Sequence, residues 1–385
     1  MQAQPVVFTF CDYYLPGYKA GGPLQTIANM VEHLSDQFSF RIVTRDRDLG
    51  DRKPYPECKI ETWVPVGKAQ VLYLPPHRMQ MHSLRRIINQ TPHEVLYLNS
   101  LFSPSFTIVP LALRRFGLIP PRRTVLAPRG ELAQSALRKS GTKKSVYQSL
   151  ARILGLYRGV TWQASSDYEA ADIRNRIGRH ETVTVAPDLP PPIADSTQPL
   201  LRRRKQPGTL KALFLSRIHP VKNLDGALRM LDGPNGRIEL NVYGPREDRA
   251  YTGVCERLAK TLPPNVAVHF RGPVAKEQVA SIMCDHDLLL LPTHGENFGH
   301  VILESLLAGC PVLISDRTPW RNLEAAGVGW DLPLNAPQRF HAVLQRLIDA
   351  DESDQQLRSQ RARQYGRQFC LDETMFEQNQ ALFAA

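Results

Sequence analysis

The sequence has no closely spaced pair of cysteines and no long apolar run, and each absence argues against a class of protein. Its six cysteines include no C-x-x-C pair and no metal-ligand spacing with histidine, which argues against a zinc site or a disulfide framework. No apolar run approaches the roughly 18 residues that a membrane-spanning helix needs. The uncharged start MQAQP leads into a run too short for a signal peptide. We expect a folded protein of the reducing cytosol.

Acidic side chains are fewer than basic ones. The 385 residues hold 48 Lys and Arg against 37 Asp and Glu, which gives a formal net charge of +11. The length is about twice that of a common single domain and predicts two domains. The hydrophobic share of 42% and the charged share of 22% are ordinary for a globular chain. The charge predicts anionic partners, among which nucleic acid, anionic lipid and phosphorylated small molecules all remain open.

Most of the positive charge falls in one stretch. Residues 101–150 contain a single acid, Glu131, and nine basic residues, so this stretch alone contributes +8. A second cluster, Arg202 to Lys205, lies in a polar, proline-rich segment and is expected to be solvated linker. The nine basic residues are Arg114, Arg115, Arg122, Arg123, Arg129, Arg138, Lys139, Lys143 and Lys144.

Short β-rich runs alternate with amphipathic stretches of ten or more residues, and this pattern predicts βαβ units around a parallel sheet. The pattern occurs twice, which predicts two doubly wound α/β domains at residues 1–186 and 209–370. Residues 187–208 have five prolines in their first thirteen positions and are expected to form the linker. The expected strands are Val6–Phe10, Phe40–Thr44, Val71–Leu74, Val95–Leu98, Thr124–Ala127, Val160–Gln163 and Val183–Ala186, then Ala212–Leu215, Glu239–Tyr243, Val266–Phe270, Leu288–Leu291 and Val312–Ile314.

Open parallel sheets bind ligands outside the carboxyl ends of their strands, so the loops after strands are the places to search. In the first such loop, Gly21 and Gly22 precede a helix expected over Pro23–Leu34. Backbone amides at a helix start can bind an anion, and Lys19 adds a positive charge. A plain turn is the alternative, because the spacing fits neither a dinucleotide fingerprint nor a P-loop.

The loop SRIHPVKNLDGAL follows the first strand of the second domain. Arg217 and Lys222 stand five positions apart in it, so both can project from the sheet edge. A rigid guanidinium fork and a point charge together suit a diphosphate. The alternative is a pair of solvated surface cations.

A third loop and helix read ENFGHVILE, with Glu296 in the loop and Glu304 inside the helix. Glu304 can accept hydrogen bonds from two vicinal hydroxyls, such as those of a ribose. A glycosidase acid and nucleophile pair is an alternative reading of the two carboxylates. Glu296 can contact sugar hydroxyls together with the amides at the helix start, which belong to Phe298, Gly299 and His300.

Together these loops resemble the GT-B glycosyltransferases of the large retaining family 4. The resemblance covers nearly the whole chain, and ENFGHVILE with SRIHPVKNLDGAL upstream carries it most specifically. It implies two Rossmann-like domains with an interdomain cleft, the acceptor in the first domain and the nucleotide sugar in the second. A last helix within residues 371–385 is then expected to cross back to the first domain. The motifs YKAGGP, YLNSLFS and APRGEL resemble a bacterial branch that assembles exopolysaccharide or O-antigen.

The resemblance also implies roles for the three loops. The cation pair binds the diphosphate, Glu296 contacts the donor sugar, Glu304 holds the ribose, and the Gly-Gly loop closes over the phosphates. Transfer is expected to retain the anomeric configuration and to need no metal or other cofactor. The matches to D-x-D at Asp46–Asp48 and Asp285–Asp287 are expected to be strand-end and turn carboxylates rather than a metal site.

The sequence departs from the family near the reacting carbon. Many members carry a histidine after a strand of the first domain, where this sequence reads LAPRGEL. Either Arg129 and Glu131 or Asn99 and Ser100 are expected to take that local role.

The sequence therefore predicts a transferase that moves a sugar from a UDP- or GDP-linked donor to a glycan or polyprenyl-diphosphate-linked acceptor, in bacterial polysaccharide biosynthesis. A GT-B nucleotide-sugar epimerase and a non-catalytic partner subunit stay open, because a fold does not fix chemistry. A basic nucleic-acid-binding protein is a further alternative, although no nucleic-acid motif is present. The basic stretch predicts peripheral docking on anionic lipid at the inner face of the plasma membrane.

Overall fold

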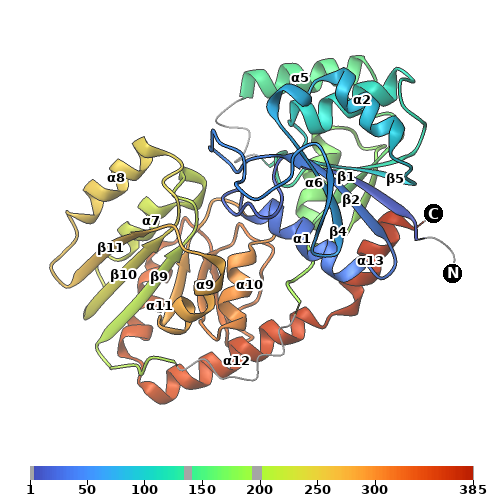
Figure 1. The fold of residues 1–385 in the computed structure, drawn as a ribbon. Helices are drawn as coiled ribbons and strands as arrows, with labels where there is room; N and C mark the ends of the chain where they lie inside the picture. Colours follow the sequence, from blue (N-terminus) through green and yellow to red (C-terminus); the bar gives the residue numbers. More distant parts are fainter. Residues whose placement is uncertain (1–3, 134–140, 193–201, 385) are drawn as a thin grey trace. The chain divides into compact units, whose positions relative to one another are not determined.

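The computed structural model describes residues 4–133, 141–192 and 202–384, and the chain forms two compact units (Figure 1). The first unit comprises Met1–Pro192 and Asp372–Ala385, and the second comprises Ile193–Leu371. Each unit has its own sheet, with helices between successive strands. A parallel sheet covered in this way buries apolar side chains on both faces, so the two units have separate hydrophobic cores.

The described sheet of the first unit has eight strands in the order β3-β4-β2-β1-β5-β6-β7-β8. All neighbours run parallel except β3, which is antiparallel to β4 at the edge. In the register, Val7 is the partner of both Phe40 and Val95. The strands are β1 (Val6–Phe10), β2 (Ser39–Arg45), β3 (Trp63–Val66), β4 (Ala69–Leu74), β5 (Val95–Asn99), β6 (Arg123–Ala127), β7 (Val160–Ala164) and β8 (Thr182–Val185), and the longer helices are α1 (Gly22–Leu34), α2 (Met81–Gln90), α3 (Val109–Arg115), α5 (Gly141–Ile153), α6 (Asp167–Arg176) and α13 (Glu373–Phe383).

The second unit has a described six-stranded sheet in the order β11-β10-β9-β12-β13-β14, and all its pairs are parallel. Its central strand β12 reads LLLL and is fully buried, as a strand covered on both faces requires. The strands are β9 (Thr209–Leu215), β10 (Arg237–Tyr243), β11 (Val266–Gly272), β12 (Leu288–Leu291), β13 (Val312–Ser315) and β14 (Gly329–Leu332), and the helices are α7 (Leu224–Met230), α8 (Arg249–Ala259), α9 (Lys276–Cys284), α10 (His300–Leu307), α11 (Pro337–Asp349) and α12 (Glu352–Cys370).

Each strand expected from the sequence overlaps a strand of the structure, and the prediction of two doubly wound α/β domains is confirmed. Two edge strands were not expected. β3 reads WVPV, and a central proline argues against a strand except at an edge, where this one lies. β14 begins at Gly329, where an added Cβ would lie 2.3 Å from the carbonyl oxygen of Val312, so glycine permits the close pairing with β13.

Both sheets contain a point where the direction of winding reverses. In the first sheet, β1 lies between β2 and β5, and the chain builds outward from β1 on one side before it returns to β5. In the second sheet, β9 lies between β10 and β12 in the same manner. At such a point the loops after the two neighbouring strands diverge, and the space between them is where open α/β sheets bind ligands. The fold therefore selects the loops after β1, β5, β9 and β12.

Helix α13 packs against the first unit, next to α1 (Figure 1). Its Phe383 is 2% exposed and makes edge-on ring contacts with Phe38, Phe40 and Tyr97. At the helix end, the Arg123 guanidinium donates to the carbonyl oxygens of residues 381 and 384. Such cations satisfy the last carbonyls of a helix and oppose its dipole. The last segment of the chain is thus part of the first unit's core.

We expect Phe383→Ala to lower the free energy of unfolding by roughly 3–5 kcal/mol, because a buried aromatic ring leaves a cavity when it is removed. Glu377→Ala, on the exposed side of the same helix, is the matched control and should change little. Denaturant unfolding followed by fluorescence measures both variants. Equal stability of the two would show that α13 does not contribute to the core.

Candidate functional site

The loops after β9 and β12 are fastened to each other in the second unit. The Asn223 side chain donates to the carbonyl oxygen of Pro292 at 2.8 Å. From the other loop, the His294 backbone N–H and the Thr293 hydroxyl both donate to the carbonyl oxygen of Val221, at 2.7 and 3.0 Å. These bonds fix the two loops at the point where the winding of the sheet reverses. The side chains that the loops carry are therefore held in place before any ligand arrives.

An ion pair joins the same two loops. Lys222 Nζ lies 2.5 Å from Glu296 Oε1, and the two side chains are only 14% and 10% exposed. A charge this far from water is costly without a partner, so each of these residues depends on the other or on a ligand that replaces it. Two residues that sequence reasoning assigned to the donor, 74 positions apart, are thus in direct contact.

Arg217 lies in the same loop as Lys222, but its setting is different. Its guanidinium is 2.7 Å from Glu247, and both side chains are more than a third exposed. Exposed ion pairs contribute about 0–1 kcal/mol, so an anionic ligand can displace Glu247 at little cost. The backbone before Arg217 is packed closely. An added Cβ at Gly244 would lie 1.9 Å from the Ser216 carbonyl oxygen, so only glycine allows this approach.

The start of α10 is shaped by its cap. Gly299 adopts φ 82, a left-handed conformation that favours glycine, and an added Cβ would lie 2.8 Å from Ile302 Cδ1. The preceding Phe298 is buried against Trp320 and Phe369, and its carbonyl oxygen accepts a 2.6 Å hydrogen bond from the Trp320 indole. Phe298 therefore anchors the loop through its side chain. Any contact that it makes with a ligand comes from its backbone.

The ring of His300, at the first position of α10, lies 4.7 Å from the Phe298 ring. Glu304 lies one turn further along the helix and is partly buried. Burial raises the pKa of Glu304 to about 7, although the positive charge of Lys276 opposes this shift. This carboxyl group is consequently near half-protonated at neutral pH. Perturbed carboxyl groups of this kind gather at functional sites.

The Gly-Gly loop of the first unit is held by a carboxylate in the loop after β2. Asp48 accepts hydrogen bonds from the backbone N–H groups of Tyr18 at 2.8 Å and Lys19 at 3.1 Å. Gly21 caps α1 at φ 67, and Gly22 opens the helix. Lys19 was expected to supply a mobile charge, but its ammonium group is paired with Asp51 at 2.6 Å. As a glycine, Gly21 brings no capping side chain to the start of α1, and Lys19 is already paired with Asp51.

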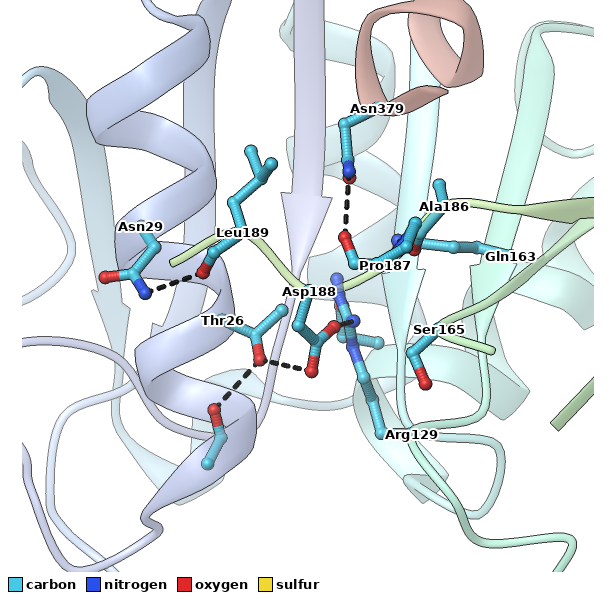
Figure 2. Close-up of polar contacts among 12 residues, drawn as sticks. Thr26, Asn29, Arg129, Gln163, Ser165, Ala186, Pro187, Asp188, Leu189 and Asn379 are labelled. Carbon is cyan, nitrogen blue, oxygen red and sulfur yellow. Dashed lines mark hydrogen bonds and ion pairs between the residues drawn. The ribbon is translucent and has the colours of Figure 1, made fainter. Parts of the chain in front are cut away.

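The candidate acceptor residues are bonded to one another. Arg129 is almost fully buried, and its guanidinium donates to Asn99 Oδ1 at 3.1 and 2.8 Å and to the Tyr97 hydroxyl at 2.5 Å. It also forms an ion pair with Asp188 at 2.7 Å (Figure 2). Burial alone would lower the pKa of Arg129, but Tyr97 and Asp188, among other neighbours, raise it. Arg129 is therefore a fixed buried cation at the carboxyl ends of β5 and β6.

Ser100 and Glu131 form the second half of this arrangement. Glu131 accepts hydrogen bonds from the Ser100 hydroxyl at 2.9 Å and from the backbone N–H groups of Leu101 at 2.5 Å and Phe102 at 3.2 Å. Burial raises the pKa of Glu131, and these hydrogen bonds lower it. Ser100 and Arg129 both adopt positive φ, at 77 and 55. Strained backbone of this kind concentrates at functional sites. The two alternatives from the sequence are one network rather than competing sites.

The same network reaches the Gly-Gly loop through Asp188. Its second carboxylate oxygen accepts a 2.9 Å hydrogen bond from the Thr26 hydroxyl, which also lies 3.1 Å from the carbonyl oxygen of Gly22 (Figure 2). On either side of Asp188, Asn29 donates to the Leu189 carbonyl oxygen and Asn379 to that of Pro187, both at 2.8 Å. The chain therefore leaves the first unit along a segment bonded to α1 and α13.

Several basic side chains donate hydrogen bonds to backbone carbonyl oxygens instead of extending into solvent. Arg114 donates to the carbonyl oxygens of residues 158 and 159, and Arg115 to that of residue 154. Lys205 was expected in a solvated cluster, but it is 4% exposed and its ammonium group donates to Gln206 and Thr209 carbonyl oxygens. Of the other basic residues in the stretch, Arg138 and Lys139 lie outside the described residues.

The two D-x-D segments lie at strand ends, and their carboxylates are engaged. Asp46 is bonded to Arg47 and Asp48 to the backbone of the Gly-Gly loop. In the other segment, Asp285 pairs with Lys211, and Asp287 pairs with Arg203 and accepts the Lys211 backbone N–H. Within the described ranges, no three His, Cys, Asp or Glu side chains gather in a way that could hold a metal ion.

The sequence did not predict three acids that bond to the candidate site residues, namely Glu247, Asp48 and Asp188. Each is an acid in a loop after a strand, at 29 positions or more from the candidate residue that it bonds. The sequence signal was weak, since Glu247 and Asp48 follow strands by a few residues, as many surface carboxylates do. Asp188 stood in the proline-rich segment that the sequence suggested was linker.

Residues 201–365 match the family model described as Glycosyl transferases group 1. Among curated proteins, a D-inositol 3-phosphate glycosyltransferase of Rhodococcus erythropolis is 31% identical over 117 residues, which cover 29% of this chain and 26% of that protein. The matched stretch is thus about a quarter of the length of this relative. This relative, an inositol-phosphate glycosyltransferase by name, represents a different branch from the exopolysaccharide or O-antigen branch that the first-domain motifs suggested.

Solved structures resemble the whole chain. A sucrose-phosphate synthase from Thermosynechococcus elongatus has a TM-score of 0.70 at 15% identity and covers 99% of this chain and 98% of its own. Anabaena Alr3699/HepE, solved with UDP and glucose, has a TM-score of 0.65 at 14% identity and covers 98% of both chains. At such identities the likeness concerns the fold. The chain therefore has the GT-B fold, and its residues 201–365 are those that match the glycosyl transferases group 1.

Proposed function

We propose that this protein transfers a sugar from a nucleotide-diphosphate donor to a hydroxyl acceptor, with the donor bound mainly by the second unit. The single observation that carries the proposal is the buried Lys222–Glu296 pair at the winding reversal of the second sheet. A cation and a carboxylate joined at that position can bind a phosphate and a sugar hydroxyl side by side. The family match over residues 201–365 supports the same assignment.

The chemistry follows from the charge that develops when the glycosidic bond breaks. Negative charge grows on the departing diphosphate, and fixed cations that interact more strongly with the transition state than with the ground state lower the barrier. Lys222 and Arg217 supply two such cations from one loop. When the diphosphate takes over Lys222, the carboxylate of Glu296 is released to accept a hydrogen bond from the sugar. The amides of Gly21 and Gly22 provide a further anion site on the first unit.

Lys222→Ala is expected to reduce the transfer rate by a factor on the order of 10² to 10³, because it removes a preorganised charge contact with the leaving group. The matched control is Lys211→Ala, which breaks a Lys–Asp ion pair of the same unit outside the site. Steady-state kinetics and a thermal unfolding profile are measured for both variants. Near wild-type turnover in a folded Lys222→Ala protein would remove this residue from the mechanism.

Glu304 is proposed to accept hydrogen bonds from the ribose hydroxyls as a carboxylate. Since its pKa is about 7, donor affinity should fall as pH drops below 7, where the group must lose a proton before it binds. Calorimetric titration with UDP or GDP at pH values from about 5.5 to about 8.5, on either side of this pKa, measures how donor affinity depends on pH. In Glu304→Gln the affinity should be weaker, and its change with pH should be smaller than in the wild type, because only the terminal phosphate of the nucleotide still titrates there.

The same ionisation affects stability in the opposite direction. The folded protein holds the Glu304 proton more tightly than the unfolded chain, so ionisation destabilises the fold as pH rises from 4.5 to about 7. Glu304→Gln should therefore raise the free energy of unfolding at pH 8 by about 3 kcal/mol, with little gain at pH 4. Glu277→Gln, an exposed glutamate on α9, is the control. Gains that are equal at both pH values would contradict the assignment.

We propose further that transfer proceeds with retention of configuration and without a metal ion. The support for metal independence is that Arg217 and Lys222, both in the loop after β9, can supply positive charge to a diphosphate that a metal would otherwise supply. Transfer should therefore continue at an unchanged rate in excess EDTA. A loss of activity that Mg²⁺ or Mn²⁺ restores would refute this part of the proposal.

The acceptor is proposed to be a glycan or a lipid-diphosphate-linked sugar at an anionic membrane surface. The polysaccharide branch rests on the first-domain motifs alone, and the inositol phosphate named for the curated relative makes a small phosphorylated acceptor the second candidate. No helix among the described residues is long and apolar enough to cross a membrane. Docking at the surface would then need a patch of its own.

Two other classes of function are separated by one measurement. An epimerase converts the nucleotide sugar into an isomeric nucleotide sugar and yields no free nucleotide as product, and a non-catalytic partner subunit leaves the nucleotide sugar unchanged. Free nucleoside diphosphate that forms only when an acceptor is supplied identifies a transferase. Binding of duplex DNA that weakens steeply as the salt concentration rises would instead favour a nucleic-acid-binding protein.

A further inference from the structure

Helix α5 presents apolar side chains to solvent. Val146, Leu150, Ile153 and Leu154 are 53%, 52%, 80% and 45% exposed. Their spacing of four, three and one positions places them on one side of the helix and its end. A surface helix of a soluble protein normally carries polar residues on this side. The stripe is therefore an exposed apolar patch rather than a few scattered hydrophobic side chains.

The opposite side of α5 is already packed. Ala151 is 1% exposed and belongs to the core of the first unit, and the Tyr147 ring lies edge-on to Phe102 at 5.8 Å. The helix thus uses separate sides for the core and for solvent. About half of Val146, Leu150 and Leu154 and most of Ile153 stay exposed, so packing within the described residues leaves much of the apolar stripe uncovered.

The patch continues onto the end of α3. Arg115 donates to the carbonyl oxygen of Leu154 at 2.9 Å, and Arg114 donates to that of Arg158 at 2.8 Å, so the carboxyl ends of α3 and α5 are bound together. Phe116, directly after α3, is 60% exposed. In Figure 1, α5 and α2 lie along the same side of the first unit. The apolar stripe and Phe116 therefore belong to one end of this unit.

The part of the sequence that carries the patch is basic and has few acids. Between Glu94 and Asp167 the sequence has eleven basic residues and one acid, Glu131. Glu131 is committed to hydrogen bonds with the loop after β5, so it does not offset this charge at the surface. Arg152 and Arg158 are exposed beside the stripe. A second copy of this chain would bring like charges together, whereas an anionic bilayer would complement them.

We propose that α5 is a membrane-docking helix, with Val146, Leu150, Ile153 and Leu154 entering the headgroup region of an anionic bilayer and the neighbouring arginines binding lipid phosphates. An apolar stripe flanked by basic residues is the pattern by which interfacial helices bind membranes. This inference assigns a membrane-binding surface to the membrane-linked transfer of the proposed function. It rests on the proposed function only for the biological reason to bind a membrane. Binding to lipid is measurable without donor or acceptor.

The test is flotation of the full chain with vesicles of phosphatidylcholine and phosphatidylglycerol, and with vesicles of phosphatidylcholine alone. The wild-type protein should float with the anionic vesicles and much less with the neutral ones. Leu150→Ser/Ile153→Ser should weaken the apparent affinity by roughly tenfold or more, because it removes apolar area from the interface. The matched control is Leu357→Ser, an exposed leucine on α12 of the second unit, which should bind as wild type.

Equal flotation of the Leu150→Ser/Ile153→Ser variant and the wild type would overturn the assignment of α5. Equal binding to neutral and anionic vesicles would overturn the role of charge. If the wild type binds no vesicles and light scattering shows a dimer that the variant abolishes, the stripe is a protein interface and the proposal fails. A thermal shift with UDP is measured in parallel. Loss of that shift in the wild type contradicts the proposed donor site and leaves the lipid result intact.

Discussion

The site depends on a constraint of topology, the reversal of winding in each parallel sheet. At β9 and β12 the chain leaves two neighbouring strands in different directions, so contacts between the loops themselves must hold those loops together. Lys222 and Glu296 provide that connection, supported by the bond from Asn223 to the Pro292 carbonyl oxygen. The loops are thus joined through a charged pair, and the proposed donor site lies at their junction. The Lys222–Glu296 pair therefore joins the two loops and also belongs to the proposed donor site.

In the first unit, a buried cation joins the segments that follow different strands. Arg129 binds Asn99 at the end of β5 and Asp188 in the segment after β8, and Asp188 binds Thr26 in α1. A buried ion pair adds little stability on balance, but loss of one partner leaves an uncompensated charge. This makes the relative positions of α1, β5 and the exit segment strongly determined. The left-handed backbone of Ser100 and Arg129 persists because this network holds it.

The sequence predicted the fold well because apolar runs determine buried parallel strands, as LLLL of β12 does. It selected the candidate donor loops because their residues lie close together within short motifs. It missed contacts between residues distant in sequence, since no local pattern records them. Lys205 is the clearest case: its proline-rich surroundings suggested solvent, whereas the ammonium group is buried against backbone carbonyls. The pairing of Arg129 with Asp188 was hidden for the same reason.

The net charge of +11 also has a different meaning in the folded chain. Arg114, Arg115 and Arg123 direct their guanidinium groups at backbone carbonyls, several of them at helix ends, where a cation stabilises the protein itself. Such residues still contribute long-range potential, but their donors are already used. Charge alone therefore gives a weak attraction to any anionic surface, and it cannot orient the molecule. An apolar stripe such as that of α5 can, because buried area is lost unless one particular side faces the bilayer.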